Sequence, residues 1–285
     1  METKPEQEEI EFPEDAESPA AAKASAGKPK RKSSPKPAAA PAKSTSNAAF
    51  ETRELRAELS KFHRSTPIPG YEKSVGSVKY GVYAFYDYDD EPIYVGQTRE
   101  SLSQRISRHL TNQRSDAVAM NVLDPFEVRK IVVYPLTEYQ GVKAKKGDPK
   151  FGEAQAALNS LEYTVYKQAI EKSKFKAILN EKQPVEAPIF DPLPKPYEAT
   201  IVSDEVMKLR GHPDTRIARR ASTIARLSQV IAEREVQGGL RRSLVTQAKR
   251  LVALAQDRAD ALHAEPEVGP SDRDETDNEL PAADS

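Results

Sequence analysis

The chain of 285 residues contains no cysteine and no tryptophan, and its charges nearly cancel to a net −1. Without cysteine, disulfide-stapled folds, zinc fingers, thiolate clusters and cysteine nucleophiles are excluded. No apolar run approaches the roughly 18 residues that cross a bilayer, so we expect no integral membrane protein. The first residues are acidic and contain proline, so we expect no secretory signal in them. These absences favour a soluble, intracellular protein with one or two domains and tails.

The small net charge hides separate charged blocks. Residues 1–20 carry eight acids and one lysine, whereas residues 21–50 carry seven lysines and arginines and no acid. Residues 51–204 balance, residues 205–264 carry a net charge of +6, and residues 265–285 carry −7. Because the blocks differ so much, each segment indicates more about its partners than the overall charge does.

Both ends of the chain have low-complexity composition. Residues 1–48 are rich in alanine, lysine, proline and acids, and residues 265–285 are acidic. Such stretches bury too little apolar surface to offset the entropy lost on ordering, so we predict that both are disordered. The basic part of the first tail has two interpretations: an arm that neutralises DNA phosphates, or a solubilising tail.

Changes in composition divide the rest of the chain. A helical pattern near residues 50–63 precedes a turn-rich stretch, and a densely patterned region ends at a run with five prolines. We therefore predict six segments: 1–48, a disordered charged tail; 49–75, a helix and connecting loop; 76–182, the main domain; 183–203, a proline-rich linker; 204–264, a basic helical hairpin; and 265–285, a disordered acidic tail.

The main domain begins with a predicted β-hairpin. Residues 78–86 and 93–95 are β-branched and aromatic, and the turn-forming cluster 87–92 separates them. Acids at 89–91 in this turn resemble a metal cluster, but a solvated hairpin tip is the interpretation we prefer. Residues 127–136 supply the third predicted strand.

A predicted helix follows the hairpin at residues 101–110. Ser101 and Gln104 form a capping-box pattern, and leucine and isoleucine recur every four residues. Arg105 and His109 are one turn apart and about 100° from that apolar stripe. We therefore expect both side chains at the border of the buried face.

A longer helix is predicted from Asp148, a good cap, to about Lys172. Glu162 lies four residues after Leu158 and interrupts the apolar face. An unpaired buried carboxylate is costly, so Glu162 needs a cation. The candidates are a metal ion and Arg105.

Two tripeptides carry a family resemblance. A Gly-Val-Tyr sequence at 81–83 and a Tyr-Val-Gly sequence at 94–96, ten residues apart, resemble the paired signature of GIY-YIG nucleases. Further polar residues continue in the family's order: Arg105 and His109 on the next helix, Glu162 after the third strand, and Asn180 soon after that helix.

The resemblance covers about residues 78–182, with two departures. Valine replaces the middle isoleucine in both tripeptides, which keeps a β-branched apolar residue, and Gln97 stands where some relatives carry lysine. The resemblance implies an α/β fold with a small three-stranded antiparallel sheet flanked by helices, followed here by the C-terminal helical hairpin and disordered termini. It also implies phosphodiester hydrolysis with one divalent metal ion, Mg²⁺ or Mn²⁺, per site.

The resemblance assigns roles that suit the chemistry of the residues. Glu162 would ligate a hard cation that keeps several waters, and Arg105 would bind the scissile phosphate. Tyr83 or Tyr94 would position or deprotonate the water, although a phenol with a pKa of about 10 is a weak base unless cations lie nearby. Those cations would be Arg105, His109 and the metal. Asn180 would tie the backbone of the site together.

The C-terminal segment is predicted to form two amphipathic helices. Apolar residues recur at three- and four-residue spacing on either side of Gly238 and Gly239. The net charge of +6 is expected to place seven arginines on the outer faces: 216, 219, 220, 226, 241, 242 and 250. A DNA-docking module is the preferred interpretation, and a homodimer formed through these helices is the alternative.

The sequence therefore predicts a metal-dependent DNA endonuclease with the catalytic residues Tyr83, Tyr94, Arg105, His109, Glu162 and Asn180. The predicted nucleic-acid contacts are Lys143, Lys145, Lys146, Arg219, Arg220, Arg241 and Arg242. The alternative is a catalytically silent nucleic-acid-binding or structural partner protein that retains the fold. The expected location is the cytoplasm, with the nucleoid, in a bacterium, or the nucleus in a eukaryote.

Overall fold

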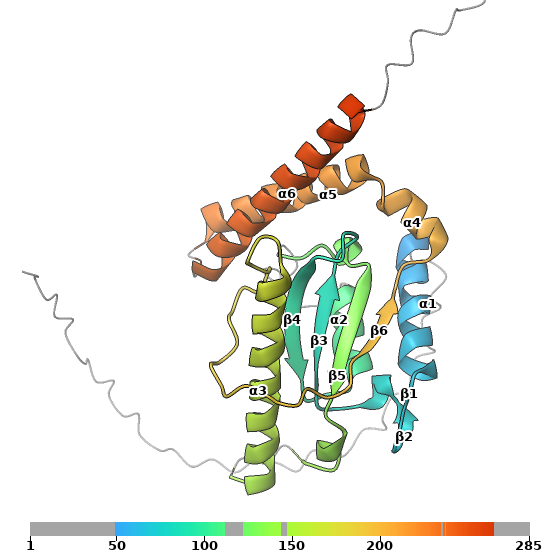
Figure 1. Ribbon diagram of the computed structural model, residues 1–285, viewed down its shortest axis with the longest axis vertical. Helices are drawn as coiled ribbons and strands as arrows, with labels where there is room; N and C mark the ends of the chain where they lie inside the picture. Colours follow the sequence, from blue (N-terminus) through green and yellow to red (C-terminus); the bar gives the residue numbers. More distant parts are fainter. Residues whose placement is uncertain (1–48, 112–121, 144–146, 235, 237, 265–285) are drawn as a thin grey trace, which may run out of the picture. The chain divides into compact units, whose positions relative to one another are not determined.

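A four-stranded antiparallel sheet, in the order β4-β3-β5-β6, lies at the centre of the computed structural model (Figure 1). The structure describes residues 49–111, 122–143, 147–234, 236 and 238–264. The predicted lysines 145 and 146 and both terminal tails lie outside these residues. The strands are β3 (Gly81–Tyr86), β4 (Pro92–Thr98), β5 (Lys130–Pro135) and β6 (Tyr197–Thr200).

The fourth strand corrects the prediction of a three-stranded sheet. β6 lies inside residues 183–203, which we predicted to be only a linker, and it pairs antiparallel with β5 from Val133–Tyr197 to Lys130–Thr200. It is a four-residue edge strand directly after Pro196, with alternate residues half-buried. The prolines dominate the local sequence pattern, and so short a strand is defined by its partner rather than by its own periodicity.

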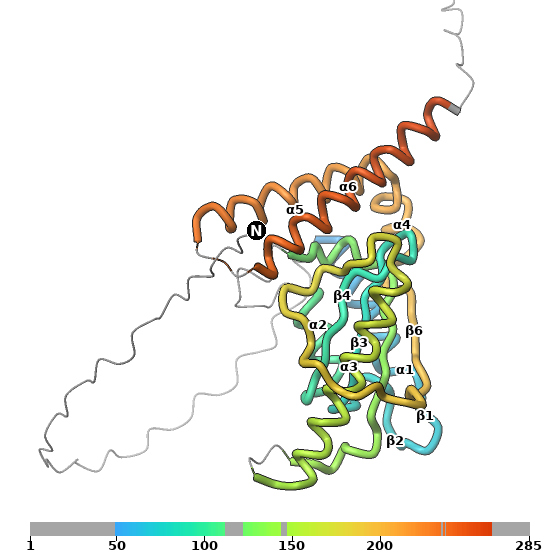
Figure 2. The backbone as a smooth tube through the Cα atoms, turned by 60° about the vertical axis from the view of Figure 1, so that its left-hand side comes forward, coloured from blue at the N-terminus to red at the C-terminus, as the bar shows by residue number. Residues whose placement is uncertain are grey.

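Helices cover the two faces of the sheet with separate cores (Figure 2). On one face, α1 (Phe50–Ser65) and α2 (Leu102–Leu110) pack against Tyr83, Phe85 and Ile131. On the other face, α3 (Pro149–Lys172) packs against Val82, Ala84 and Val95. This alternation follows from the period of two along a strand.

Capping residues fix where the two helices of the predicted site begin. The Ser101 hydroxyl accepts a hydrogen bond from the Gln104 backbone amide at the start of α2. The Asp148 carboxylate accepts one from the Lys150 amide at the start of α3, where Pro149 is the first helical residue. Both caps agree with the sequence prediction, because each satisfies a donor that the first helical turn leaves unpaired.

Short elements complete the fold around these layers. The turn-rich stretch after α1 contains the two-stranded pair β1 (Pro67–Ile68) and β2 (Tyr71–Ser74) and the short helix η2 (Val75–Ser77). The 3₁₀ turns η4 (Pro125–Glu127) and η5 (Thr137–Tyr139) flank β5. None of the described helices is long and apolar enough to span a bilayer.

The C-terminal region forms α4 (Asp204–Arg210), α5 (Pro213–Glu233) and α6 (Gly238–Ala264). Helices α5 and α6 pack against each other, and Leu227 and Leu240 enter the same core as α1 and α2. The described residues all belong to a single compact unit, Thr45–Ser285. The two predicted C-terminal helices are therefore present, but they share a core with the sheet.

Ion pairs join these helices to the β3–β4 turn and to η4. Arg250 donates to Asp87 over 2.6 Å, Arg220 lies 3.4 Å from Glu127, and Arg216 forms an ion pair with Asp89. The exposed fractions of Arg220 and Arg250 are only 3% and 2%.

One prediction about this region is wrong, and one holds in part. Arg216, Arg220 and Arg250 do not lie on outer faces, because they pair with acids of the β3–β4 turn and η4. In the acidic turn, Asp89 and Asp90 are exposed as expected for a solvated tip, whereas Glu91 is buried and accepts from the Lys174 amide. Arginines that appear exposed in the sequence are thus buried as ion pairs.

Candidate active site

Gly96 on β4 allows the two signature tyrosines to approach each other. A Cβ atom at this position would lie 2.7 Å from the Tyr83 hydroxyl oxygen and 2.9 Å from Cε1 of Tyr94, closer than real Cβ contacts. Tyr83 is fully buried, and its ring lies 6.2 Å from that of Tyr94. The glycine therefore lets the Tyr83 hydroxyl lie over the backbone of the edge strand.

The Tyr83 hydroxyl contacts both polar residues of α2. Arg105 Nε donates to it over 3.3 Å, and His109 Nδ1 lies 3.2 Å from it. The phenolic oxygen is the main cause of a raised pKa for Arg105, so this guanidinium remains a cation. His109 is buried and packs edge-on against Tyr94, with ring centroids 4.6 Å apart. The four side chains form one connected cluster.

A cavity of about 470 Å³ opens beside this cluster at the edge of the sheet. Tyr94, Arg105 and His109 line it from the α2 face, and Glu162 lines it from α3. Because β4 is the edge strand, side chains from opposite faces of the sheet meet around it.

Glu162 is half-buried and held by Gln97. The Gln97 side-chain amide donates to Glu162 Oε2 over 2.8 Å and to Asn159 Oδ1 over 3.1 Å. Burial raises the pKa of Glu162 to about 7, against the opposing effects of the Gln97 hydrogen bonds and the Arg105 charge. A pKa this high means that the neighbouring groups offset only part of the cost of burying the carboxylate charge.

The chemistry of these donors fits a single hard cation. Glu162 supplies a carboxylate whose negative charge is only partly balanced by its neighbours. The buried Oε1 of Gln97 has no hydrogen-bond partner among the described residues. No group of three or more histidine or acidic side chains gathers as a metal cluster in the described part of the chain. Mg²⁺ commonly takes only one or two protein carboxylates and retains waters. Glu162 is therefore the residue that would hold the ion, with the Gln97 oxygen beside it.

Asn180 holds the backbone of β4. Its Oδ1 accepts from the Val95 amide over 3.0 Å, and its Nδ2 donates to the Val95 carbonyl over 2.7 Å. The neighbouring Leu179 amide donates to the Ile93 carbonyl over 2.8 Å. The segment after α3 thus pairs with the outer edge of β4, which agrees with the backbone-tying role expected for Asn180.

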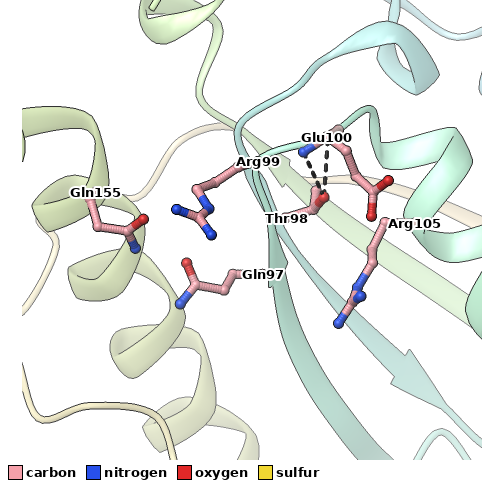
Figure 3. Close-up of a pocket in the computed structure, with 6 residues that line it drawn as sticks. All are labelled: Gln97, Thr98, Arg99, Glu100, Arg105 and Gln155. Carbon is pink, nitrogen blue, oxygen red and sulfur yellow. Dashed lines mark hydrogen bonds between the residues drawn. The ribbon is translucent and has the colours of Figure 1, made fainter. Parts of the chain in front are cut away.

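A second hollow of about 580 Å³ adjoins the cavity through Gln97 and Arg105. Figure 3 shows Gln97 of β4 and Arg99, which directly follows β4, extending toward Gln155 of α3, with Arg105 on the other side of the strand. Gln155 donates to the same Asn159 oxygen as Gln97, over 2.7 Å. A chain of amides therefore lies between α3 and β4 beside Glu162.

The predicted nucleic-acid contacts are dispersed. Arg241 and Arg242 are exposed at the start of α6, and Lys143 is exposed in the loop before α3. Arg219 is half-buried and pairs with Asp124 over 2.8 Å. Arg220 is buried against Glu127, so in this conformation it does not face a ligand.

Gln97 is the site residue whose structural role the sequence did not reveal. Its position next to the Tyr-Val-Gly tripeptide marked it as a departure from a basic residue, but not as the hydrogen-bond partner of Glu162. The only available signal was spacing: Gln97 lies two residues after Val95, on the strand face that α3 covers.

One of three comparisons with known proteins gave a match. Neither the curated proteins nor the solved structures gave a match. The family model described as the GIY-YIG catalytic domain matches residues 79–144, which include both tripeptides, Arg105 and His109. Glu162 and Asn180 lie beyond the matched segment, and the fold brings them to the same cavity. Residues 79–144 of this chain thus match the GIY-YIG catalytic domain, which is typical of a nuclease family.

Proposed function

We propose that this protein is a metal-dependent endonuclease that hydrolyses phosphodiester bonds of DNA in the cavity beside β4. One observation carries the proposal. Side chains from β4, α2, α3 and the segment after α3 line a single cavity, although more than eighty positions separate the first from the last. These are Tyr94, Arg105, His109, Glu162 and Asn180, and Tyr83 contacts two of them from behind.

Arg105 is suited to bind the scissile phosphate. It lines both the cavity and the adjoining hollow, and the Tyr83 hydroxyl fixes the orientation of its Nε. A planar guanidinium binds phosphate oxygens through paired donors, and a fixed one stabilises charge that develops during the reaction. Arg105 would therefore both position the phosphate and stabilise its transition state.

The two tyrosines have different surroundings, which favours a division of roles. Tyr94 is half-buried and lines the cavity, whereas Tyr83 is fully buried between Arg105 and His109. Tyr94 would hold the attacking water at its hydroxyl. Tyr83 would orient the guanidinium and exchange a proton with His109 Nδ1 across 3.2 Å. A bound divalent ion would add Lewis-acid stabilisation of phosphate charge at Glu162.

A nucleic-acid substrate is supported by charge near the cavity. The exposed Arg241 and Arg242 follow Gly239, whose backbone packs against the carbonyl of Glu181, a residue of the cavity wall. Cations so placed would contact phosphates next to the cut site and increase affinity without reading sequence. Lys143 would extend this set only if the substrate also follows α3 toward its start.

A cleavage assay tests the proposal. The protein would be incubated with duplex, nicked, branched and single-stranded DNA, and with RNA, in the presence of Mg²⁺ or Mn²⁺. We expect metal-dependent cleavage of at least one DNA substrate, abolished by a chelator. Binding without cleavage of any substrate in either metal would favour the catalytically silent alternative. Preferential cleavage of RNA would contradict the proposed substrate.

A further inference from the structure

A polar groove of about 600 Å³ lies between α1, the β2–η2 segment and α2. Three arginines line it: Arg56 and Arg64 from α1 and Arg108 from α2. Serine hydroxyls from all three elements supply hydrogen-bonding groups between these cations. Helix α1 lies outside the matched segment 79–144, so the groove is not built from the family's catalytic domain alone.

The charge in this groove is positive and incompletely neutralised. Among the described residues, Glu100 is the only acidic residue that lines it, and it is already paired with Arg108 through both carboxylate oxygens. Arg56 and Arg64 form no ion pair within the described residues. Two guanidinium groups therefore remain for an anion.

A buried histidine, His63, lies in the wall of the groove. The exposed fraction of His63 is 4%, and its Nε2 has no hydrogen-bond partner in the described part of the chain. A buried polar atom without a partner is costly, and such atoms are rare in folded proteins. Burial lowers the pKa of His63 to about 4, so the ring is neutral at physiological pH and adds no charge to the groove wall.

Gly76 helps to shape this part of the groove. A Cβ atom at Gly76 would lie 2.5 Å from Cβ of His63 and 2.7 Å from its carbonyl oxygen. The backbone of η2 therefore lies directly against His63, which holds the histidine in place at the groove wall.

The groove is adjacent to the candidate active site. Glu100 lines both the groove and the hollow that contains Gln97 and Arg105. Helix α2 presents Arg105 to the active site and Arg108 to the groove. A helix with side chains is about 10 Å across, which corresponds to about three base pairs of duplex at 3.4 Å each.

We propose that this groove is a second phosphate-binding site, which holds the backbone of the DNA a few nucleotides from the bond that is cut. Arg56, Arg64 and the serine hydroxyls bind phosphate oxygens. The inference rests on the proposed function for the identity of the polymer. It adds a site of backbone contact that positions the substrate and carries no base specificity.

Salt-dependent binding of a cleavable duplex tests the groove. Arg56→Gln with Arg64→Gln removes two cations, so the slope of log K against log salt should fall by about 1 to 2. The dissociation constant at low salt should rise roughly tenfold or more. The control is Lys61→Gln with Lys73→Gln, which removes two exposed cations from α1 and β2 outside the groove. The control should leave the slope closer to that of the unchanged protein.

A second variant excludes loss of folding as the cause. Ser103→Glu introduces a carboxylate into the groove within the first turn of α2, where an acidic side chain stabilises a helix. We expect weaker DNA binding with undiminished thermal stability. Unchanged affinity in both groove variants would overturn the proposal. Weaker binding of inorganic phosphate together with unchanged DNA binding would also overturn it, because the groove would then be a small-anion site.

The outcomes separate this proposal from the proposed function. If the groove variants lose affinity for DNA while the unchanged protein cleaves nothing, the groove is supported as a DNA-binding site and the nuclease proposal fails. If the protein cleaves DNA and the groove variants bind it normally, only the groove proposal fails. At saturating protein, the groove variants should cut at a rate within about threefold of the unchanged protein, because the groove touches no reacting atom.

Discussion

At the scale of single residues, the candidate site depends on uncharged residues as much as on charged ones. Gly96 leaves the space that the Tyr83 hydroxyl occupies, and Gln97, next in the chain, holds the carboxylate of Glu162. These two neighbouring residues thus act on opposite faces of the edge strand: Gly96 makes room for Tyr83, and Gln97 binds Glu162. The tyrosine cluster lies on one face and the carboxylate on the other.

Substitution of Gly96 tests this packing. Gly96→Ala should reduce the free energy of unfolding by about 1 to 3 kcal/mol, because the added methyl group forces both tyrosine rings to move. Cleavage should fall as well, since the displaced Tyr83 no longer orients Arg105. Urea unfolding measures the first effect. Gly152→Ala, in α3 with open space around it, should be neutral or slightly stabilising; an equal loss in both variants would refute the packing account.

Gln97 gives a second test at this scale. Gln97→Leu removes the donor to Glu162 and should reduce the rate of cleavage by about 10- to 100-fold, the usual cost of losing a hydrogen-bond partner of a metal ligand. DNA affinity should stay within about threefold. Gln155→Leu is the matched control, because Gln155 contacts Asn159 but not Glu162. Equal rates for the two variants would contradict the role of Gln97.

His63 predicts how stability depends on pH. The unfolded chain protonates this ring near its ordinary pKa of 6.5, whereas the folded protein does so only near pH 4. The unfolded state therefore binds more protons in this interval, and stability falls as pH decreases from about 6.5 to about 4. The loss attributable to His63 is at most about 3 kcal/mol. His63→Phe should flatten this part of the curve from urea titrations, and the exposed His263→Gln should not.

At the scale of elements, helix α6 is part of the framework rather than an appended module. Arg250 from α6 reaches Asp87 in the β3–β4 turn, and Ser243 donates to the Leu179 carbonyl over 3.4 Å. Gly239 packs against Glu181 in the cavity wall. The C-terminal helices thus support both the hairpin turn and the segment that carries Asn180.

Removal of one buried cation tests this attachment. Arg250→Ala should destabilise the protein by about 3 to 5 kcal/mol, because Asp87 and Glu127 then remain buried with insufficient compensation. Thermal or urea unfolding measures the change. The exposed Arg242→Ala should change stability by less than about 0.5 kcal/mol. A loss below about 1 kcal/mol for Arg250→Ala would show that the network contributes little to the attachment.

The elements also show what sequence can predict here. Periodicity and caps predicted the hairpin, α2, α3 and the two long C-terminal helices, since each repeats a local pattern over several turns or residues. The sequence pattern did not predict β6, whose pairing is defined by β5. It also misplaced Arg220 and Arg250, because a buried ion pair leaves no periodic signal: its partners lie more than ninety positions away.

At the scale of the whole molecule, the site is assembled from parts inside and outside the segment that the family model matches. Residues 79–144 contribute the tyrosines, Arg105 and His109, whereas Glu162 and Asn180 come from α3 and the segment after it. Resemblance to the GIY-YIG pattern led us to predict these six residues as a site. Only the fold shows that they meet at an edge strand, with α2 and α3 on opposite faces.

The central claim is that the Glu162 carboxylate makes this cavity a hydrolytic site. The most direct measurement compares DNA cleavage and DNA binding for Glu162→Gln and for Glu171→Gln, an exposed position on the same helix. We predict that Glu162→Gln cuts at least about 100-fold more slowly while its DNA affinity changes by less than about threefold, and that Glu171→Gln behaves like the unchanged protein. Full cleavage activity in Glu162→Gln would contradict the account.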